Sequence, residues 1–337
     1  TGASNIAVGY LAACSNTTGT QNTVTGVCAL FNNSTGGSNT AYGFCSLTAN
    51  TTASQNNASG VYALHSNTTG SNNVAHGYSA LGANTTASYN VAVGMRALNS
   101  NTTASYNTAV GGCALKTNTT GNNNTAVGWS ALYSSTCSGC NVAIGVCSLT
   151  ANVSGGRNTA VGYKTLASNL CAYENTASGY NALRDNTTGD YNTASGAYAM
   201  RNNTTGCRNT AFGRTALCGN TTGSRNVSVG MQSMCGATTG TNNTAVGYQV
   251  LKDNTTGAYN TASGAYALYT QTTGCGNTAT GYYSLFANTT GCFNTASGHL
   301  ALKLNTTGGV NAAFGFKALC GNTTGACNVA VGGNALF

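Results

Sequence analysis

The chain has 337 residues, with twelve basic and four acidic side chains, a net charge of +8 and no proline. The basic residues are spread thinly and form no dense stripe with stacking aromatic residues, so we do not expect nucleic-acid binding. No segment approaches eighteen consecutive apolar residues, which excludes a membrane-spanning helix.

A block of 17 residues repeats along the whole sequence without insertion or deletion. Its first position is asparagine and its fifth is glycine in every block. So strict a period is typical of coils that stack on their neighbours. We therefore predict an all-β fold, a parallel β-solenoid (β-roll) of about twenty 17-residue coils with one rung per repeat. We expect a single continuous array over residues 1–337, and because both ends fall inside a block, a fragment of, or a unit in, a longer fibre.

Each block, taken in chain order, predicts two short strands and a turn. In the block that begins at Asn243, residues 244–246 (Thr-Ala-Val) lie between asparagine and glycine, and their composition is typical of a strand. Residues 248–251 predict a second short strand. Residues 254–257 (Asn-Thr-Thr-Gly) predict a turn whose glycine adopts a positive φ. The frequent glycines and the lack of a 3.6-residue apolar period exclude a helix.

Residues at the same position in successive blocks form a column. The third, eighth and ninth columns are mostly alanine, alanine and leucine, which predicts that they face a narrow interior. The first-position asparagines are expected to form a structural ladder of amide hydrogen bonds, although tolerance of a left-handed turn is an alternative. These residues are Asn5, Asn22, Asn39, Asn56, Asn73, Asn90, Asn107, Asn124, Asn141, Asn158, Asn175, Asn192, Asn209, Asn226, Asn243, Asn260, Asn277, Asn294, Asn311 and Asn328.

The second, fourth and sixth columns form a half-apolar face. In a lone solenoid this face would be exposed along its length, which is a large patch for a soluble monomer. We therefore expect identical chains to cover it, and predict a homo-oligomer, either a trimer about a threefold axis or an end-to-end filament.

The pattern N-T-A-V-G-Y-x-A-L resembles the head repeats of trimeric autotransporter adhesins (YadA-like). Ala126-Val127-Gly128 and Ala143-Ile144-Gly145 match the Ala-Ile-Gly core of those repeats, although the coil here is three residues longer. The 17-residue form, as in 107–124, is similar to repeats of bacterial and viral tail-fibre-like proteins. The resemblance covers the whole chain and implies a trimeric parallel β-roll in an extracellular fibre or adhesin stalk.

The twelfth column contains candidate N-glycosylation sites. Fifteen of the nineteen complete blocks read Asn-x-Ser/Thr there, the triplet that glycosylation requires on an accessible loop. The alternative is that Asn-Thr-Thr-Gly simply makes a good turn, since coils ~4.8 Å apart would crowd neighbouring sugars. The candidates are Asn16, Asn33, Asn50, Asn67, Asn84, Asn101, Asn118, Asn152, Asn186, Asn203, Asn220, Asn254, Asn288, Asn305 and Asn322.

Fifteen cysteines are present, and several share a column on adjacent coils. Stacked neighbours would come within the distance range of a disulfide, and cross-links would fit an oxidising exterior. An unpaired cysteine as a small filler is the alternative. The disulfide candidates are Cys28 with Cys45, Cys218 with Cys235, and Cys275 with Cys292.

The sequence indicates no catalytic, cofactor-binding or metal site. The motif Cys137-x-x-Cys140 stands alone, and the three histidines occupy three different columns, which does not suit a metal site. The four acidic residues flank no plausible cleft, and no nucleophile elbow or phosphate loop occurs. We therefore do not expect an enzyme or a cofactor.

The favoured hypothesis is a non-enzymatic structural component of an extracellular filament, secreted or on a cell or virion surface. Variable aromatic residues of the sixth column are candidates for weak adhesive contacts, with surface glycans as the partner, and packing at an interface is the alternative: Tyr10, Phe44, Tyr78, Trp129 and Tyr163. The alternative is an ice-binding (antifreeze) solenoid in which Thr-Thr at positions thirteen and fourteen gives one outward row, since adjacent strand residues face opposite sides. A third hypothesis is carbohydrate adhesion along the side of the solenoid.

Overall fold

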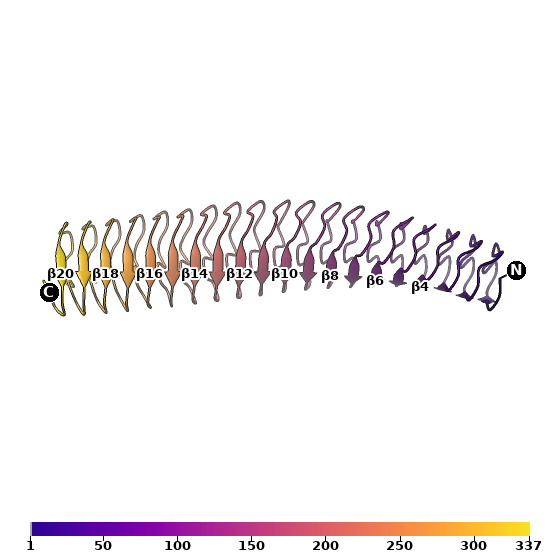
Figure 1. Cartoon of the computed structure of the whole chain (residues 1–337), viewed down its shortest axis with the longest axis horizontal. Helices are drawn as coiled ribbons and strands as arrows, with labels where there is room; N and C mark the ends of the chain where they lie inside the picture. The colour runs from indigo at the N-terminus through magenta and orange to yellow at the C-terminus, as the bar shows by residue number, and fades with distance from the viewer. Residues whose placement is uncertain (1) are drawn as a thin grey trace. The chain divides into compact units, whose positions relative to one another are not determined.

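The structure is a computed structural model that describes residues 2–337. Within these residues the regular elements are all strands, and each 17-residue coil contributes one of them. The chain forms two compact units, Thr1–Cys171 and Ala172–Phe337. In each unit consecutive strands lie side by side and point the same way, while loops close each coil (Figure 1). The predicted all-β parallel solenoid is therefore confirmed for each unit, and the continuity of one array through both stays a prediction.

The first unit contains a parallel sheet of ten strands in chain order. Equivalent positions of successive repeats pair in register, so that Ala75 of one strand pairs with Ala92 of the next. The strands are β1 (Ile6–Val8), β2 (Thr23–Thr25), β3 (Thr40–Tyr42), β4 (Asn57–Ser59), β5 (Val74–His76), β6 (Val91–Val93), β7 (Thr108–Val110), β8 (Thr125–Val127), β9 (Val142–Ile144) and β10 (Thr159–Val161).

The second unit repeats this arrangement with ten further strands. Ala245, for example, pairs with Ala262 of the following strand. The strands are β11 (Thr176–Ser178), β12 (Thr193–Ser195), β13 (Thr210–Phe212), β14 (Val227–Val229), β15 (Thr244–Val246), β16 (Thr261–Ser263), β17 (Thr278–Thr280), β18 (Thr295–Ser297), β19 (Ala312–Phe314) and β20 (Val329–Val331).

The predicted second strand of each coil was wrong. Residues 248–251 form a turn in which Gln249 and Leu251 have positive φ angles of 52° and 49°. The turn ends with a hydrogen bond of 3.3 Å from the Asn254 N–H to the Leu251 carbonyl. A left-handed conformation costs leucine about 1–2 kcal/mol. Leu251 is fully buried, which contributes roughly 1.5–3 kcal/mol and offsets this cost.

The turn glycine was also assigned the wrong backbone conformation. Gly257 does not have a positive φ, and within this coil the left-handed residue of that turn is Tyr259, at 59°. The position at which the backbone requires glycine is the fifth. Gly60 has a φ of 144°, and a Cβ atom there would lie 2.5 Å from the Gly77 carbonyl oxygen. Stacking of glycine on glycine explains why this column admits no other residue.

The interior of each coil is thin and closely packed. Ala75, Ala80 and Leu81, at the third, eighth and ninth positions of one block, are fully buried. The same columns are buried along both units, apart from the first and last coils, so the predicted inward positions are confirmed. Each coil therefore depends on its neighbours for burial and hydrogen bonding, and the variable columns remain on the outside.

Candidate functional site

Within each unit the first-column asparagines form a repeated pattern of hydrogen bonds inside the solenoid. The Oδ1 atom of Asn56 accepts from the backbone N–H of Asn73 at 3.0 Å and from its Nδ2 atom at 3.2 Å. The Nδ2 atom of Asn73 also donates to the Ala87 carbonyl at 2.9 Å. Both side chains are buried. We call this column the first Asn ladder; it ties each coil to the next and satisfies the backbone at a bend.

The twelfth column forms a second Asn ladder. The Nδ2 atom of Asn67 donates to Asn50 Oδ1 at 3.0 Å and to the Gly70 carbonyl at 2.8 Å. Equivalent bonds join Asn84 to Asn67 at 2.8 Å. Sequence analysis missed this ladder because the Asn-x-Thr triplet suggested an exposed loop. The signal available was that the twelfth position is asparagine in all but three of the nineteen complete blocks, close to the invariance of the first.

Burial of the second Asn ladder is at odds with the glycosylation hypothesis. A glycan must be attached to the asparagine Nδ2 atom, yet in this column that atom points into the solenoid and donates hydrogen bonds. Two candidates, Asn16 and Asn322, lie near the chain ends and are half-buried. The other thirteen are fully buried: Asn33, Asn50, Asn67, Asn84, Asn101, Asn118, Asn152, Asn186, Asn203, Asn220, Asn254, Asn288 and Asn305. Attachment of a sugar to any of these would require the ladder to open.

Interruptions of the second Asn ladder leave hydrogen-bond acceptors without partners. Ala237 replaces asparagine in the coil after Asn220, and the Asn220 Oδ1 atom is buried without a hydrogen-bond donor. The same is true of Asn118, whose next coil carries Ser135, and of Asn254, which precedes Gln271. The ladder therefore depends on the residue one coil later in the chain, and each substitution is felt by the coil before it.

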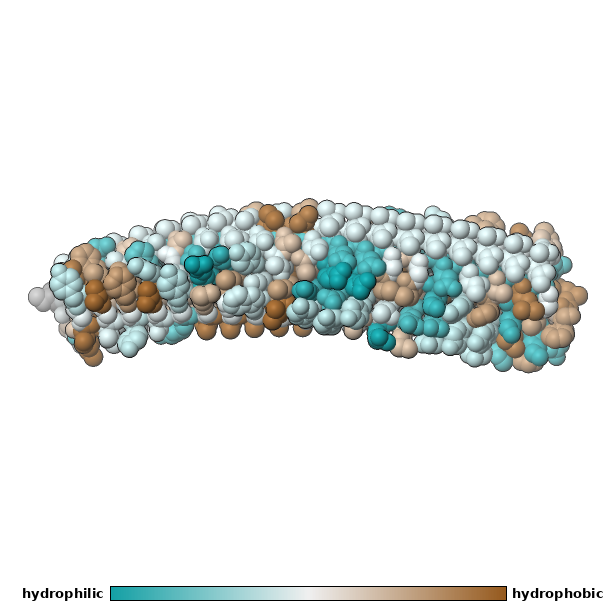
Figure 2. Space-filling model, turned by 180° about the vertical axis from the view of Figure 1, so that it is seen from behind, coloured by the Kyte–Doolittle hydropathy of each residue, from teal (hydrophilic) through white to brown (hydrophobic). Residues whose placement is uncertain are grey.

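An apolar stripe runs along the outside of the strands, formed by the residues of the fourth and sixth columns. In the first unit the fourth column is aliphatic on five consecutive coils, β6 to β10, and Ile144 in this run is 40% exposed. Figure 2 shows apolar side chains gathered in short rows that polar residues interrupt. The sixth column adds exposed aromatic residues, including Trp129 and the predicted Tyr10, Phe44, Tyr78 and Tyr163.

Aromatic rings cluster on the outside of the second unit. Tyr266 stacks on Tyr283 with ring centroids 4.9 Å apart, and Tyr269 stacks on Phe286 at 5.2 Å. The Lys252 ammonium donates to the Tyr269 hydroxyl at 2.8 Å. These rings come from the seventh and tenth columns of successive coils, so neighbouring blocks build the cluster together.

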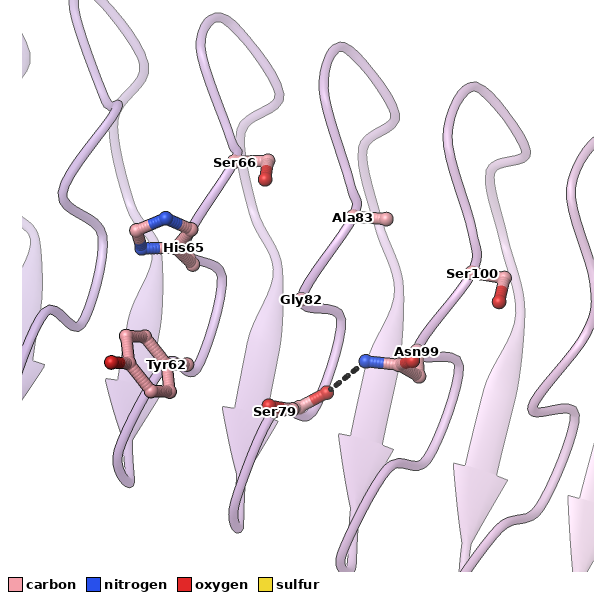
Figure 3. A pocket seen from close by; sticks show the side chains of 8 residues that line it. All are labelled: Tyr62, His65, Ser66, Ser79, Gly82, Ala83, Asn99 and Ser100. Atoms are coloured by element: carbon pink, nitrogen blue, oxygen red, sulfur yellow. Dashed lines mark hydrogen bonds between the residues drawn. The ribbon is translucent and has the colours of Figure 1, made fainter.

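An open groove of about 400 Å³ lies on the first unit, lined by residues from three successive coils. Figure 3 shows Tyr62 and His65 on one side of it and Asn99 on the other. The Asn99 Nδ2 atom donates to the Ser79 carbonyl at 3.0 Å, which closes one side of the groove. The His65 ring packs edge-on against Tyr62, with ring centroids 5.4 Å apart. The groove thus carries aromatic and hydroxyl groups, and among the described residues no group of three metal-ligating side chains occurs.

The Thr-Thr segments present one outward row, as predicted. The thirteenth-column hydroxyls are used internally, since Thr68 Oγ1 donates to the Thr85 carbonyl at 3.0 Å. The fourteenth column is exposed. In the second unit it is threonine on nine consecutive coils: Thr188, Thr205, Thr222, Thr239, Thr256, Thr273, Thr290, Thr307 and Thr324.

The cysteine pairs lie in contact, and every cysteine carries a free thiol. The Sγ atoms of Cys218 and Cys235 are 2.8 Å apart, and those of Cys275 and Cys292 are 3.0 Å apart. Cys28 and Cys45 are half-buried, and burial raises the pKa of Cys45. The column arrangement therefore brings the predicted partners together, and disulfide formation stays a prediction.

No known family model matches the chain, and no curated protein is significantly similar to it. Throughout residues 2–337 there is also no helix with the length and apolarity needed to cross a membrane. The solenoid, its ladders and its exposed columns are therefore the features from which a function can be inferred.

Proposed function

We propose that this protein is a non-enzymatic structural component of an extracellular filament. Inside each coil the polar groups of the two Asn ladders hold neighbouring coils together, and the fifth-column glycines allow the coils to approach closely. Such a scaffold can be extended by repetition while its outer columns vary. This is the behaviour expected of a stiff spacer or coat, and it agrees with the resemblance of the repeats to adhesin heads and tail fibres.

The observation that carries the proposal is the exposed apolar stripe. A run of neighbouring exposed apolar side chains, such as that from β6 to β10, is typical of a site of association. We propose that identical chains pack against it, as a trimer or in an extended filament. The aliphatic run from β6 to β10 is the most regular part of the stripe and would form the centre of the contact, with exposed aromatic residues such as Trp129 beside it.

A charged residue introduced into this aliphatic run tests the proposal. Ile144→Lys would place an ammonium group in the proposed contact, where a desolvated charge is strongly unfavourable. We expect the wild-type chain to sediment as an oligomer in analytical ultracentrifugation, and Ile144→Lys to dissociate at least about tenfold more readily, which corresponds to about 1.4 kcal/mol. Thr120→Lys, on an exposed column away from the strands, is the matched control and should leave association unchanged. A wild-type chain that stays monomeric at its highest soluble concentration would reject the proposal.

The extracellular location has a separate test. Antibodies raised against the recombinant chain should label the outside of intact cells or particles of the source organism. Labelling that appears only after the cells are permeabilised would contradict this part of the proposal.

Ice binding is the second candidate function, favoured by the exposed threonine row of the second unit. Threonines in successive coils would repeat at ~4.8 Å, with methyl and hydroxyl groups in regular alternation. Thermal hysteresis at micromolar concentrations of the chain would support this function, and Thr239→Lys with Thr256→Lys should then abolish it. Absence of thermal hysteresis in the wild-type chain would reject ice binding and leave the filament as the only proposed function.

A further inference from the structure

One column of the second unit places two thiols between positive charges. The tenth column reads Arg184, Arg201, Cys218, Cys235 and Lys252 on five consecutive coils. The two cysteines are therefore preceded by an arginine and followed by a lysine in the same column. Glycine follows each cysteine in the chain, so the eleventh position of these two coils carries no side chain.

A groove opens beside the first of these thiols. It has a volume of about 280 Å³ and is lined by Tyr198, Arg201, Arg214, Thr215 and Cys218. The two guanidinium groups make the groove positively charged. The Arg201 guanidinium is oriented by a 3.0 Å bond from its Nε atom to Asn202 Oδ1 and lies over the Tyr198 ring.

The two thiols interact directly. Their Sγ atoms lie 2.8 Å apart, and a disulfide bond of ~2.05 Å would require them to approach by about 0.8 Å more. The hydrogen bond with Cys218, together with Lys252, lowers the pKa of Cys235 to about 7, against the opposing effects of burial and of Asp253. The same hydrogen bond raises the pKa of Cys218, while Arg201 acts in the opposite direction. Cys235 is therefore the thiol of the pair that ionises first, and it does so near neutral pH.

We propose that Cys218 and Cys235 form a redox-active dithiol that reacts with small anionic disulfides bound in the groove between Arg201 and Arg214. The carboxylates of such a disulfide would pair with the two guanidinium groups, which bind carboxylates in a defined geometry. The disulfide bond would then lie beside Cys218, the cysteine that lines the groove.

The reaction proceeds in two exchange steps. The Cys218 sulfur attacks one sulfur of the bound disulfide RS–SR, its proton passes to the Cys235 thiolate, and one RS⁻ leaves. The Cys235 sulfur then attacks the Cys218 sulfur of the mixed disulfide, the Cys218–Cys235 bond forms, and the second RS group leaves as a thiol with the proton. The protein dithiol loses two electrons and the small disulfide gains them, so no further oxidant is needed.

The chain contains a natural control pair. Cys275 and Cys292 lie 3.0 Å apart on adjacent coils, but their column carries no basic residue in the second unit. The hydrogen bond with Cys292 raises the pKa of Cys275. A difference in reactivity between the two pairs would therefore report the charged surroundings of Cys218 and Cys235, since the spacing of the sulfur atoms is similar.

The test uses the full reduced chain and three small disulfides of similar size, namely dithiodipropionate (anionic), 2-hydroxyethyl disulfide (neutral) and cystamine (cationic). Formation of each intrachain bridge is followed by peptide mapping and mass spectrometry without reduction. We expect the Cys218–Cys235 bridge to form at least about tenfold faster with the anion than with the cation, as expected for electrostatic attraction. The Cys275–Cys292 bridge should show no such preference.

Two variants test the assignment of roles. Arg201→Gln combined with Arg214→Gln should remove the preference for the anion, so that the anionic and cationic disulfides form the Cys218–Cys235 bridge at similar rates. Cys235→Ser should trap one RS group on Cys218, seen as the corresponding added mass. The proposal is overturned if the two cysteine pairs react alike with all three probes, if the arginine variant keeps its preference, or if Cys235→Ser accumulates no adduct on Cys218.

Discussion

Repair of the second Asn ladder at Ala237 should stabilise the chain. In the Ala237→Asn variant, the new Nδ2 atom could donate to Asn220 Oδ1, which is buried without a hydrogen-bond donor, and to the Gly240 carbonyl. The equivalent atom of Asn67 makes both bonds, at 3.0 and 2.8 Å. Each net hydrogen bond contributes about 0.5–1.5 kcal/mol, so we expect about 1–3 kcal/mol of added stability.

The assay is urea unfolding followed by circular dichroism. With a slope of a few kcal/mol per molar urea, this gain would move the midpoint by roughly 0.5–1 M to higher urea. Two controls separate ladder repair from general tolerance of asparagine. Asn67→Ala should lower the midpoint, because Asn50 Oδ1 would lose its donor. Ala216→Asn, at a buried position outside the ladder, should also destabilise. If Ala237→Asn lowers the midpoint as Ala216→Asn does, the explanation of the unsatisfied Asn220 acceptor is refuted.

Further predictions concern the glycine column and the paired cysteines. Gly77→Ala would place a Cβ atom 2.7 Å from the Gly94 carbonyl oxygen at a φ of 129°, and we expect a loss of more than about 2 kcal/mol in urea unfolding. Gly333→Ala, which has no atom within 4 Å of the added Cβ, should be neutral, and equal effects of the two changes would contradict the stacking argument. Because the pKa of Cys235 is lowered to about 7, its thiolate forms as pH rises through neutrality. Its alkylation by iodoacetamide should therefore approach its maximum rate near pH 8, whereas that of a cysteine in a short unstructured peptide, which ionises near ~8.5, should still rise steeply. Identical pH profiles for Cys235 and the peptide would show that the hydrogen bond with Cys218 does not act on Cys235.

The period of the sequence was sufficient to predict the solenoid, its inward columns and one rung per coil. It was insufficient for local backbone conformation. Leucine at the ninth position suggested a strand, yet Leu251 adopts a left-handed turn because burial in the narrow interior outweighs its conformational preference. Similarly, Asn67 reads as part of an accessible triplet, but its side chain is a hydrogen-bonding element of the interior.

Both the sequence period and the structure were needed to identify the paired thiols, the groove and the threonine row on the outside of the coils. Column position predicted that Cys218 and Cys235 would meet, because identical positions of adjacent coils lie side by side. The groove beside Cys218 could not be predicted, since it depends on how the Arg201 and Arg214 side chains lie across neighbouring coils. Likewise, Thr68 and Thr69 are identical in sequence type, and only the hydrogen bond of Thr68 to the next coil distinguishes their roles.

X-ray diffraction from an aligned sample of the purified chain tests the stacking of the coils most directly. Parallel in-register coils predict a strong reflection near ~4.8 Å along the axis of alignment. A pattern in which this reflection is missing, or in which a helical repeat near ~5.4 Å replaces it, would contradict the stacked coils on which the ladders, the apolar stripe and the paired thiols all depend.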